Sequence, residues 1–430
     1  MRFMPADNLQ VTDMTSTTER DLVLCLCTGP FNFKNMAIRQ RILYLADNFD
    51  LELVCMDVGN MGPELASRRA KVRQFPGSFK SHYWNSLAFL LWAALLSIRL
   101  CWKSHKKFSF VYSFHDCTLP LGRIARIYNG SRCKWICDVL DDPGLELNNW
   151  KARRIFTLRE RAILFALIVW NRYVRHVLSK VDLAIVQGTD THDSLPTLLH
   201  TQFGVPYDSM LCVPNGIDLE LIKPSGCKPS STPQFRIFYV GYVSELRGLG
   251  TVMKAFQTFA RQFPEARLDL VGWTKPRDQE WLERVVEESG LATQVRYHGV
   301  QDSETVWRMV EESAVCIFPF EREELSYVFP VKVFEYLALE SPVIATRLEG
   351  VSKIIQDGEN GLLVPAGDVV AWTRAFRRIR TDKPLRRRMK AVARLGIRRF
   401  SWRHINGRVI RAMQRLSEDF EIEQGELKAA

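Results

Sequence analysis

The segment from Phe329 to Glu335, Phe-Pro-Val-Lys-Val-Phe-Glu, combines a helix start with a cation and a carboxylate. Proline favours the first position of a helix, so we expect a helix to begin at Pro330. The free amides of its first turn, including that of Val331, attract anions, and Lys332 adds a full positive charge. Glu335 lies three residues further on, on the same face. The amides and Lys332 could hold a diphosphate, and the Glu335 carboxylate could accept hydrogen bonds from sugar hydroxyls. The alternative is a plain ion pair between Lys332 and Glu335.

A second candidate is the loop from Val240 to Gly248, Val-Gly-Tyr-Val-Ser-Glu-Leu-Arg-Gly. It follows an apolar run typical of a strand and precedes an amphipathic run typical of a helix. Gly241 and Gly248 permit a close backbone approach. The guanidinium of Arg247 can bind a diphosphate through two parallel hydrogen bonds. The alternative is an arginine on a solvated loop.

Polar side chains also follow apolar runs in the first half of the chain. His115 and Asp116 come directly after one run, and Asp138 and Asp141 end or follow the next. A histidine at a strand end can donate to or accept from a substrate hydroxyl. These four residues are therefore candidates for contact with a substrate hydroxyl, with a purely structural histidine as the alternative.

The elements that position these residues alternate between strand and helix patterns in both halves. The expected strands are Asp21–Cys27, Leu51–Asp57, Phe108–Ser113, Lys134–Asp138, Leu183–Gln187, Phe235–Val243, Ala266–Gly272, Val295–His298, Ala314–Phe318 and Pro342–Thr346. Helices are expected at Arg39–Asn48 and Gly248–Phe263, and a Pro/Ser-rich join at Pro224–Pro233. This predicts two doubly wound α/β domains facing across a cleft, with ligands at the carboxyl ends of the strands.

Composition fits a globular protein of two or three domains: 430 residues, 47% hydrophobic and 25% charged. The net charge of +11 comes from the segment Arg374–Arg415, which holds sixteen basic residues and one acid. That segment lacks an aromatic stacking platform and a reading helix, so we expect no nucleic acid partner. The ten cysteines are scattered in apolar runs, which indicates buried thiols in a reducing compartment. No spaced metal motif is present, and Asp141-Asp142 is adjacent rather than spaced, so no metal or other cofactor is expected.

Two apolar stretches raise the question of a membrane. Ser81–Ile98 contains no charged residue but is too short to span a bilayer, and basic residues flank it on both sides. Arg161–Lys180 repeats this pattern. We expect contact with an anionic membrane surface, with buried helices or a true span as alternatives. The chain opens without a secretory signal, so the expected location is cytoplasmic, peripheral on the inner face of the membrane.

Several motifs in sequence order resemble those of the family 4 glycosyltransferases. They are Val213–Asp218 at the domain junction, Val240–Gly248, Phe329–Leu339, Ser341–Ala345, Gly350–Asp368 and Phe400–Trp402. The resemblance runs from about residue 20 to about residue 415 and is specific in the second half. It implies the GT-B fold: residues 1–222 as the acceptor domain, 223–400 as the nucleotide-sugar domain, and 401–430 as a helix crossing back to the first domain.

The resemblance implies a retaining transfer from a nucleotide-sugar donor to a glycan or lipid-linked acceptor. By motif position, Glu335 holds the donor ribose, Arg247 grips the diphosphate and His115 contacts the transferred sugar. We count Lys332 with Arg247 and His115 as catalytic. The donor-binding set is Gly29, Gly241, Arg247, Tyr327, Val331, Lys332 and Glu335, and the acceptor side is Asp116, Asp138 and Asp141.

Two positions depart from the family pattern. The family has a glutamate where this chain has Tyr327, and often an arginine where it has Tyr242. Lys332, which many relatives lack, is expected to replace the missing cation. The departures keep two other interpretations open beside transfer: another nucleotide-sugar enzyme of the same fold, such as an epimerase, and a catalytically inactive module that docks on membranes.

Overall fold

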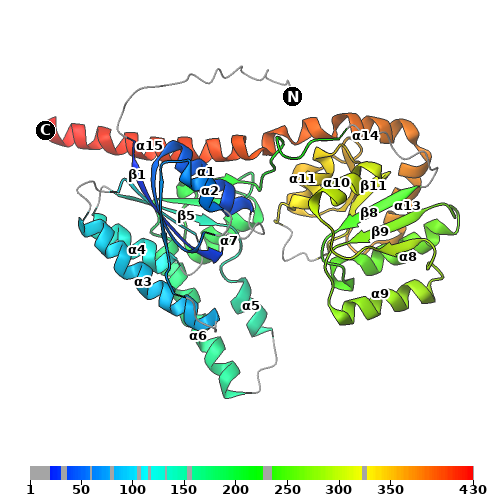
Figure 1. Cartoon of the computed structure of the whole chain (residues 1–430), viewed down its shortest axis with the longest axis horizontal. Coiled ribbons are helices and arrows are strands. Elements are labelled where there is room, and N and C mark those ends of the chain that lie inside the picture. Colours follow the sequence, from blue (N-terminus) through cyan, green and yellow to red (C-terminus); the bar gives the residue numbers. More distant parts are fainter. Residues whose placement is uncertain are drawn as a thin grey trace.

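The computed structural model describes residues 20–30, 36–58, 61–77, 82–103, 108–114, 118–130, 133–152, 157–225, 235–321 and 327–429. Two parallel β-sheets form two separate lobes, and two successive helices near the C-terminus run along one side of them, the first over the C-terminal lobe and the last over the N-terminal lobe (Figure 1). The strand order is β3-β2-β1-β4-β5-β6-β7 in the N-terminal lobe and β10-β9-β8-β11-β12-β13 in the C-terminal lobe. The predicted fold class, two doubly wound α/β domains, is confirmed.

The N-terminal lobe alternates strands and helices around the seven-stranded sheet. Its elements are β1 (Leu22–Pro30), α1 (Met36–Asn48), β2 (Asp50–Asp57), α2 (Gly62–Ala66), β3 (Ala70–Gln74), α3 (His82–Lys103), β4 (Phe110–Phe114), α4 (Leu119–Asn129), β5 (Lys134–Val139), α5 (Leu145–Lys151), α6 (Leu158–Leu178), β6 (Leu183–Gln187), α7 (Ser194–Phe203), the 3-10 turn η2 (Tyr207–Ser209) and β7 (Met210–Val213). The central strands are apolar on both faces because helices cover both sides of the sheet.

The C-terminal lobe repeats the arrangement with six strands. Its elements are β8 (Arg236–Val240), the 3-10 turn η3 (Glu245–Arg247), α8 (Leu249–Ala260), β9 (Arg267–Val271), α9 (Pro276–Glu288), β10 (Val295–Tyr297), α10 (Ser303–Glu312), β11 (Val315–Phe318), α11 (Val331–Ala338), β12 (Val343–Thr346), α12 (Glu349–Ile354), β13 (Gly361–Val364), α13 (Val369–Thr381), α14 (Lys383–Gly396), η5 (Arg398–Phe400) and α15 (Trp402–Ala429). Helix α8 buries the apolar stripe that its 3.6-residue period predicted.

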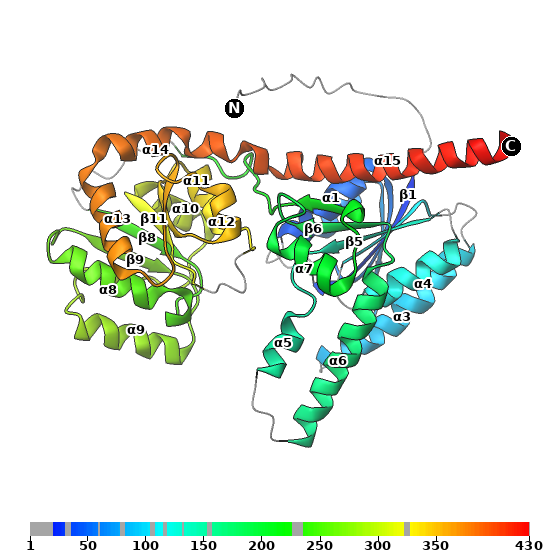
Figure 2. The ribbon, with the colours of Figure 1, turned by 180° about the vertical axis from the view of Figure 1, so that it is seen from behind.

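Helix α15 returns from the C-terminal lobe to the N-terminal lobe, as Figure 2 shows from behind. It packs beside α1 and β7. The Arg41 guanidinium in α1 donates to Asn406 Oδ1 in α15 at 2.5 Å, in the interior. The arrangement leaves the last long helix of the chain as part of the first lobe's core.

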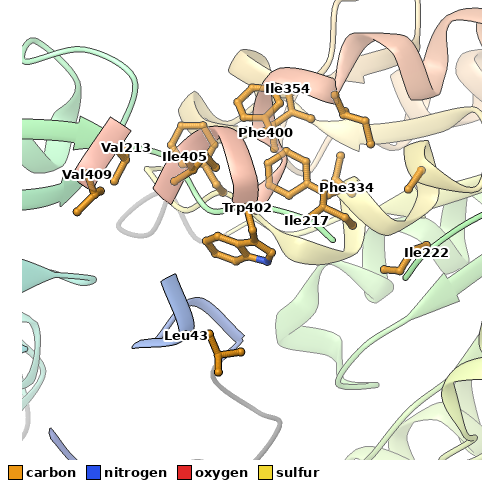
Figure 3. Close-up of a cluster of buried hydrophobic side chains, with 14 of the residues drawn as sticks. Leu43, Val213, Ile217, Ile222, Phe334, Ile354, Phe400, Trp402, Ile405 and Val409 are labelled. Carbon is orange, nitrogen blue, oxygen red and sulfur yellow. The ribbon is translucent and has the colours of Figure 1, made fainter. Parts of the chain in front are cut away.

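The crossing between the lobes is itself a packed unit. The Ile217 amide donates to the Phe400 carbonyl, and the Trp402 amide donates to the Ile217 carbonyl, so the outgoing and returning segments pair. Figure 3 shows these side chains in one cluster with Phe334 of α11, whose ring centroid lies 5.1 Å from that of Phe400. Arg394 ties the crossing further by donating to the carbonyls of Leu219, Ile222 and Ala338.

Helices α3 and α6 are each buried on part of their surface and exposed on the rest. Helix α3 buries Phe89 and Ala93 against the sheet and exposes Leu91, Leu95 and Trp102. A capping box between Thr157 and Glu160 starts α6; the side chains of α6 pack into the core near its C-terminal end, and the first half of the helix stands away from the body (Figure 1). In the described chain, no helix is both long and apolar enough to cross a bilayer.

Candidate functional site

The loop carrying Arg247 is pressed against the neighbouring strand β11. Ser244 Oγ accepts from the Leu246 amide and starts the turn η3. Gly248 has φ 79°, and a Cβ there would lie 1.6 Å from the Pro319 carbonyl oxygen. A residue with a side chain would therefore push the loop off the strand end. The expected place of Arg247, where β8 gives way to a helix at the carboxyl edge of the sheet, is the place that the structure shows.

Aromatic rings hold the Arg247 guanidinium. Its Cζ lies 5.0 Å from the Phe320 ring centroid and 5.8 Å from that of Tyr242, both within cation–π range. Tyr242 stacks on Trp273 and donates its hydroxyl to Asp278, and this hydrogen bond is the main cause of a raised pKa for Tyr242. Tyr242, which stands where the family 4 pattern often has an arginine, thus contacts the Arg247 guanidinium through its ring. The sequence analysis missed Trp273 and Phe320, although each lies within two residues of a strand end.

Helix α11 carries the second part of the candidate site. The helix begins at Val331, and Pro330 is its N-cap. The sequence predicted Pro330 as the first helical residue, so the observed start is one residue later than the predicted one. Lys332 Nζ lies 2.9 Å from Glu335 Oε2, with the two side chains 42% and 15% exposed. The ion pair expected from spacing alone therefore exists in the structure. It brings a cation and a carboxylate together on the first turn of the helix.

A buried tyrosine joins the two parts of the site. The Val240 amide, at the end of β8, donates to the Tyr336 hydroxyl of α11 at 3.0 Å. Gly241 follows, with its amide bonded to the Val271 carbonyl; a Cβ there would come 2.8 Å from the Tyr239 hydroxyl oxygen. The Arg247 loop and the Lys332 helix are therefore attached to neighbouring strands at one edge of the sheet, where open α/β sheets bind ligands.

Tyr327, expected to bind the donor, lies at the boundary between the lobes. Its side chain is 5% exposed, and its hydroxyl accepts from the Asp142 amide of the N-terminal lobe at 3.2 Å. Burial raises its pKa to about 12. Asn215 adds a second link by donating to the Phe329 carbonyl at 3.0 Å. The segment that leads into α11 is thus held by the opposite lobe.

The remaining site candidates divide into three cases. His115 and Asp116 lie outside the described residues. Gly29 is in the last part of β1, at the carboxyl edge of its sheet, and Asp141 is exposed. Asp138 is 3% exposed, which corrects the expectation that it faces an acceptor.

The Asp138 carboxylate is the centre of a buried polar network. Its Oδ2 accepts from Arg41 Nε at 3.0 Å and from the Tyr112 hydroxyl at 2.8 Å. Arg41 in turn reaches Asn406 of α15. The signal for this role in the sequence was weak, because Arg41 stands 97 residues from Asp138 and Asn406 stands 365 residues from Arg41. The Asp138 carboxylate links α1, and through Arg41 also α15, to the end of β5, and it does not face a substrate.

Two polar contacts join the lobes beside the crossing. Lys353 Nζ of α12 lies 3.0 Å from Asp193 Oδ1, and the Ser194 amide and hydroxyl both donate to the Glu349 carboxylate. Among the residues that the structure describes, no three His, Cys, Asp or Glu side chains gather as metal ligands would.

The arrangement of the lobes is that of GT-B glycosyltransferases. HepE from Anabaena, solved in complex with UDP, matches with a TM-score of 0.66 and 15% identity, over 91% of this chain and 99% of that one. A glycosyltransferase from Rickettsia africae matches at 0.67 and 14% identity, over 93% and 99%. Sucrose-phosphate synthase from Thermosynechococcus elongatus matches at 0.65 and 18%, over 92% and 99%.

The sequence comparisons found one family model and a set of curated relatives. Residues 228–395 match the family model described as glycosyl transferases group 1. D-inositol 3-phosphate glycosyltransferase from Paenarthrobacter aurescens is 25% identical over 215 residues, 47% of this chain and 51% of the relative. Phosphatidyl-myo-inositol mannosyltransferase from Mycobacterium leprae is 26% identical over 212 residues, 47% and 52%. The chain thus spans about half the length of the curated relatives it matches.

Proposed function

We propose that this protein transfers a sugar from a nucleotide-sugar donor to an acceptor, with the donor bound to the C-terminal lobe. The observation that carries the proposal is the attachment of the Arg247 loop and helix α11 to one sheet edge through Gly248 and Tyr336. This brings two cations and the N-terminal end of helix α11 to the place where the fold binds ligands. The match to group 1 glycosyl transferases covers the same residues.

In this proposal the protein stabilises a departing nucleoside diphosphate. As the bond from the sugar to the diphosphate breaks, negative charge grows on the leaving oxygens. Arg247, Lys332 and the amides of α11 oppose that charge at fixed positions. Glu335 accepts hydrogen bonds from the donor ribose, and His115 contacts the sugar that is transferred. Gly29, Gly241 and Val331 complete the proposed donor site, and Tyr327 positions the segment that leads into α11.

Retention of configuration and the absence of a metal requirement belong to the same proposal. They rest on the resemblance to family 4 and on the two cations that replace a metal at the diphosphate. The anomeric configuration of the product, followed by NMR from the start of the reaction, tests retention. Activity that survives a chelator tests the metal independence.

The proposed acceptor is a lipid-linked or membrane-associated glycan. The names of two relatives mention a phosphatidylinositol and a lipopolysaccharide core; the latter, LpsE from Rhizobium meliloti, is 30% identical over 153 residues, 36% of this chain and 42% of the relative. We place Asp116 and Asp141 on the acceptor side. The exposed apolar side chains of α3 and α6 support a peripheral position on the inner, anionic face of a membrane. They are Leu91, Leu95, Trp102, Leu158, Phe165, Ile168 and Val169.

A panel of nucleotide sugars tests the central claim. The preferred donor should raise the melting temperature by mass action, and the same donor should support transfer to an acceptor extract. Labelled donor separates the outcomes: label in a new glycoside means transfer, and label in an isomer of the donor means epimerisation. If no nucleotide sugar stabilises the protein, or if donor turnover stays at background and is unchanged by Lys332→Ala, the proposal is wrong.

A further inference from the structure

A cavity lies where the two lobes and α15 meet. It has a volume of about 280 Å³. Its lining residues are Thr189, Pro214, Lys353, Arg399, Phe400, His404, Ile405 and Arg408. None of them belongs to the donor site proposed above, so the inference below does not depend on the proposed reaction.

The lining contains three cations, and neutral oxygens hold two of them in place. Arg399 donates to the Lys353 carbonyl, and Arg408 donates to the Cys212 carbonyl, each at 3.0 Å. A carbonyl orients a guanidinium without cancelling its charge, and each guanidinium has five N–H groups. Asp193, 7% exposed, pairs with the third cation, Lys353. The cavity therefore keeps a net positive lining on its α15 side.

Two side chains of α15, His404 and Arg408, have lowered pKa values in this positive field. Burial lowers the pKa of His404, and the nearby Arg408 and Arg411 lower it further. Burial and Arg411 also lower the pKa of Arg408. Like charges are thus held close together on one helix face, at a cost that a bound anion would offset.

We propose that this cavity binds the phosphate group of a small soluble phosphate ester. Two guanidinium groups, Arg399 and Arg408, can each form paired hydrogen bonds to phosphate oxygens, and His404 can donate a further one. Pro214, Phe400 and Ile405 supply an apolar wall for the organic part of the ligand. The volume admits a phosphate with a small body, and neither α3 nor α6 reaches the site, which favours a soluble ligand over a lipid headgroup.

The position of the cavity gives its occupant a role. The lining comes from the loop after β6, from the crossing, from α12 and from α15. A phosphate bound here touches both lobes next to the Lys353–Asp193 and Ser194–Glu349 contacts. It therefore favours the lobe arrangement in which these contacts form.

Calorimetric titration with inorganic phosphate, at ionic strength balanced with potassium chloride, tests the site. The double variant Arg399→Gln/His404→Gln should weaken phosphate binding by about tenfold or more, since it removes charge-assisted hydrogen bonds. Arg415→Gln, an exposed arginine further along α15, is the matched control, and Arg247→Gln removes the competing diphosphate loop. Arg415→Gln should bind phosphate as the wild type does, and Arg247→Gln should keep the binding that the double variant loses.

Three results would overturn the site. The wild type could show no phosphate binding at millimolar concentration, the double variant could bind as tightly as the wild type, or binding could be lost in Arg247→Gln alone. The variant Arg408→Lys controls for a folding defect in the double variant. It keeps the positive charge but loses the paired N–H groups of the guanidinium, so it should bind phosphate more weakly than the wild type while its melting temperature stays unchanged. Wild-type affinity in this variant would contradict the proposed recognition.

Discussion

Arg247 takes its position from its neighbours more than from its own bonds. Gly248 lets the loop touch the Pro319 carbonyl, and the rings of Tyr242 and Phe320 flank the guanidinium. The charge is therefore aimed before any ligand arrives. Such preorganisation is what makes a single cation effective at a leaving group.

Replacing Arg247 with alanine should lower kcat/KM by a factor that corresponds to roughly 3–4 kcal/mol of transition-state stabilisation. Lys332→Ala should have a similar effect, and initial-rate kinetics with the preferred donor measure both. Arg415→Ala, on the distant part of α15, is the control and should leave the rate unchanged. Activity within threefold of wild type for both Arg247→Ala and Lys332→Ala would contradict the site.

Tyr327→Phe removes only the hydroxyl that accepts from the Asp142 amide across the lobe boundary. A hydrogen bond of this kind contributes about 1 kcal/mol, so we expect kcat to fall roughly fivefold while the KM for the donor stays the same. The KM-against-kcat split distinguishes a positioning role from donor binding. Tyr297→Phe, which loses a bond inside the C-terminal lobe, is the matched control. A raised donor KM with unchanged kcat would instead support direct donor contact by Tyr327.

At the scale of elements, the interior strands were predictable and three of the four edge strands were not. The pattern found ten strands of the two sheets, β1, β2, β4, β5, β6, β8, β9, β10, β11 and β12. It missed β3, β7 and β13, which have four or five residues. Strand β3 is a half-exposed edge strand with the sequence Ala-Lys-Val-Arg-Gln, so its pairing comes from the sheet and not from its own composition.

The candidate site was partly predictable for the same reason. Arg247, Lys332 and Glu335 lie within a few residues of a strand end or helix start, where local signals point to ligands. The burial of Asp138 was not predictable, because Arg41, which donates to it, and Asn406, which accepts from Arg41, come from distant parts of the chain. The interlobe position of Tyr327 depends on tertiary contacts in the same way.

The exposed face of α3 leads to a prediction at this scale. Leu95 and Trp102 are 71% and 85% exposed, and an apolar side chain gains free energy when it enters a bilayer interface. The double variant Leu95→Glu/Trp102→Glu should lose flotation with anionic vesicles at low salt, because it removes apolar area and adds repulsion.

The control for the flotation assay is Val370→Glu on α13, which is 66% exposed in the other lobe and should float as the wild type does. Added salt should weaken wild-type binding, since screening acts on the basic residues around α3 and α6. A wild-type protein that stays at the bottom of the gradient at low salt would exclude the interfacial role.

At the scale of the whole molecule, α15 makes the two lobes one unit. It leaves the C-terminal lobe at Trp402 and docks on α1, where Arg41 joins Asp138 and Asn406 in a buried network. Both side chains of the Arg41–Asp138 pair are at most 5% exposed. Removing one partner of such a pair strands the other charge in the interior.

Arg41→Met should therefore lower the free energy of unfolding of the N-terminal lobe by about 3–5 kcal/mol, measured by urea denaturation. Asp138→Asn in the same background should recover part of the loss, because a neutral amide costs less to bury than a carboxylate. Arg380→Met, which breaks the half-exposed pair with Glu265, should cost at most about 1 kcal/mol. Equal losses for the buried and the exposed pair would contradict the role given to the network.

The return of α15 also constrains how the chain acquires its structure during synthesis. In the part of the chain that the structure describes, α15 packs on α1 and its Asn406 accepts from Arg41. The first half of the polypeptide therefore lacks this cover, and exposes apolar surface to water, until the residues after Trp402 have been translated. Early termination anywhere in the second lobe should thus expose the first lobe to chaperones and proteases, even though every strand of its sheet is already present.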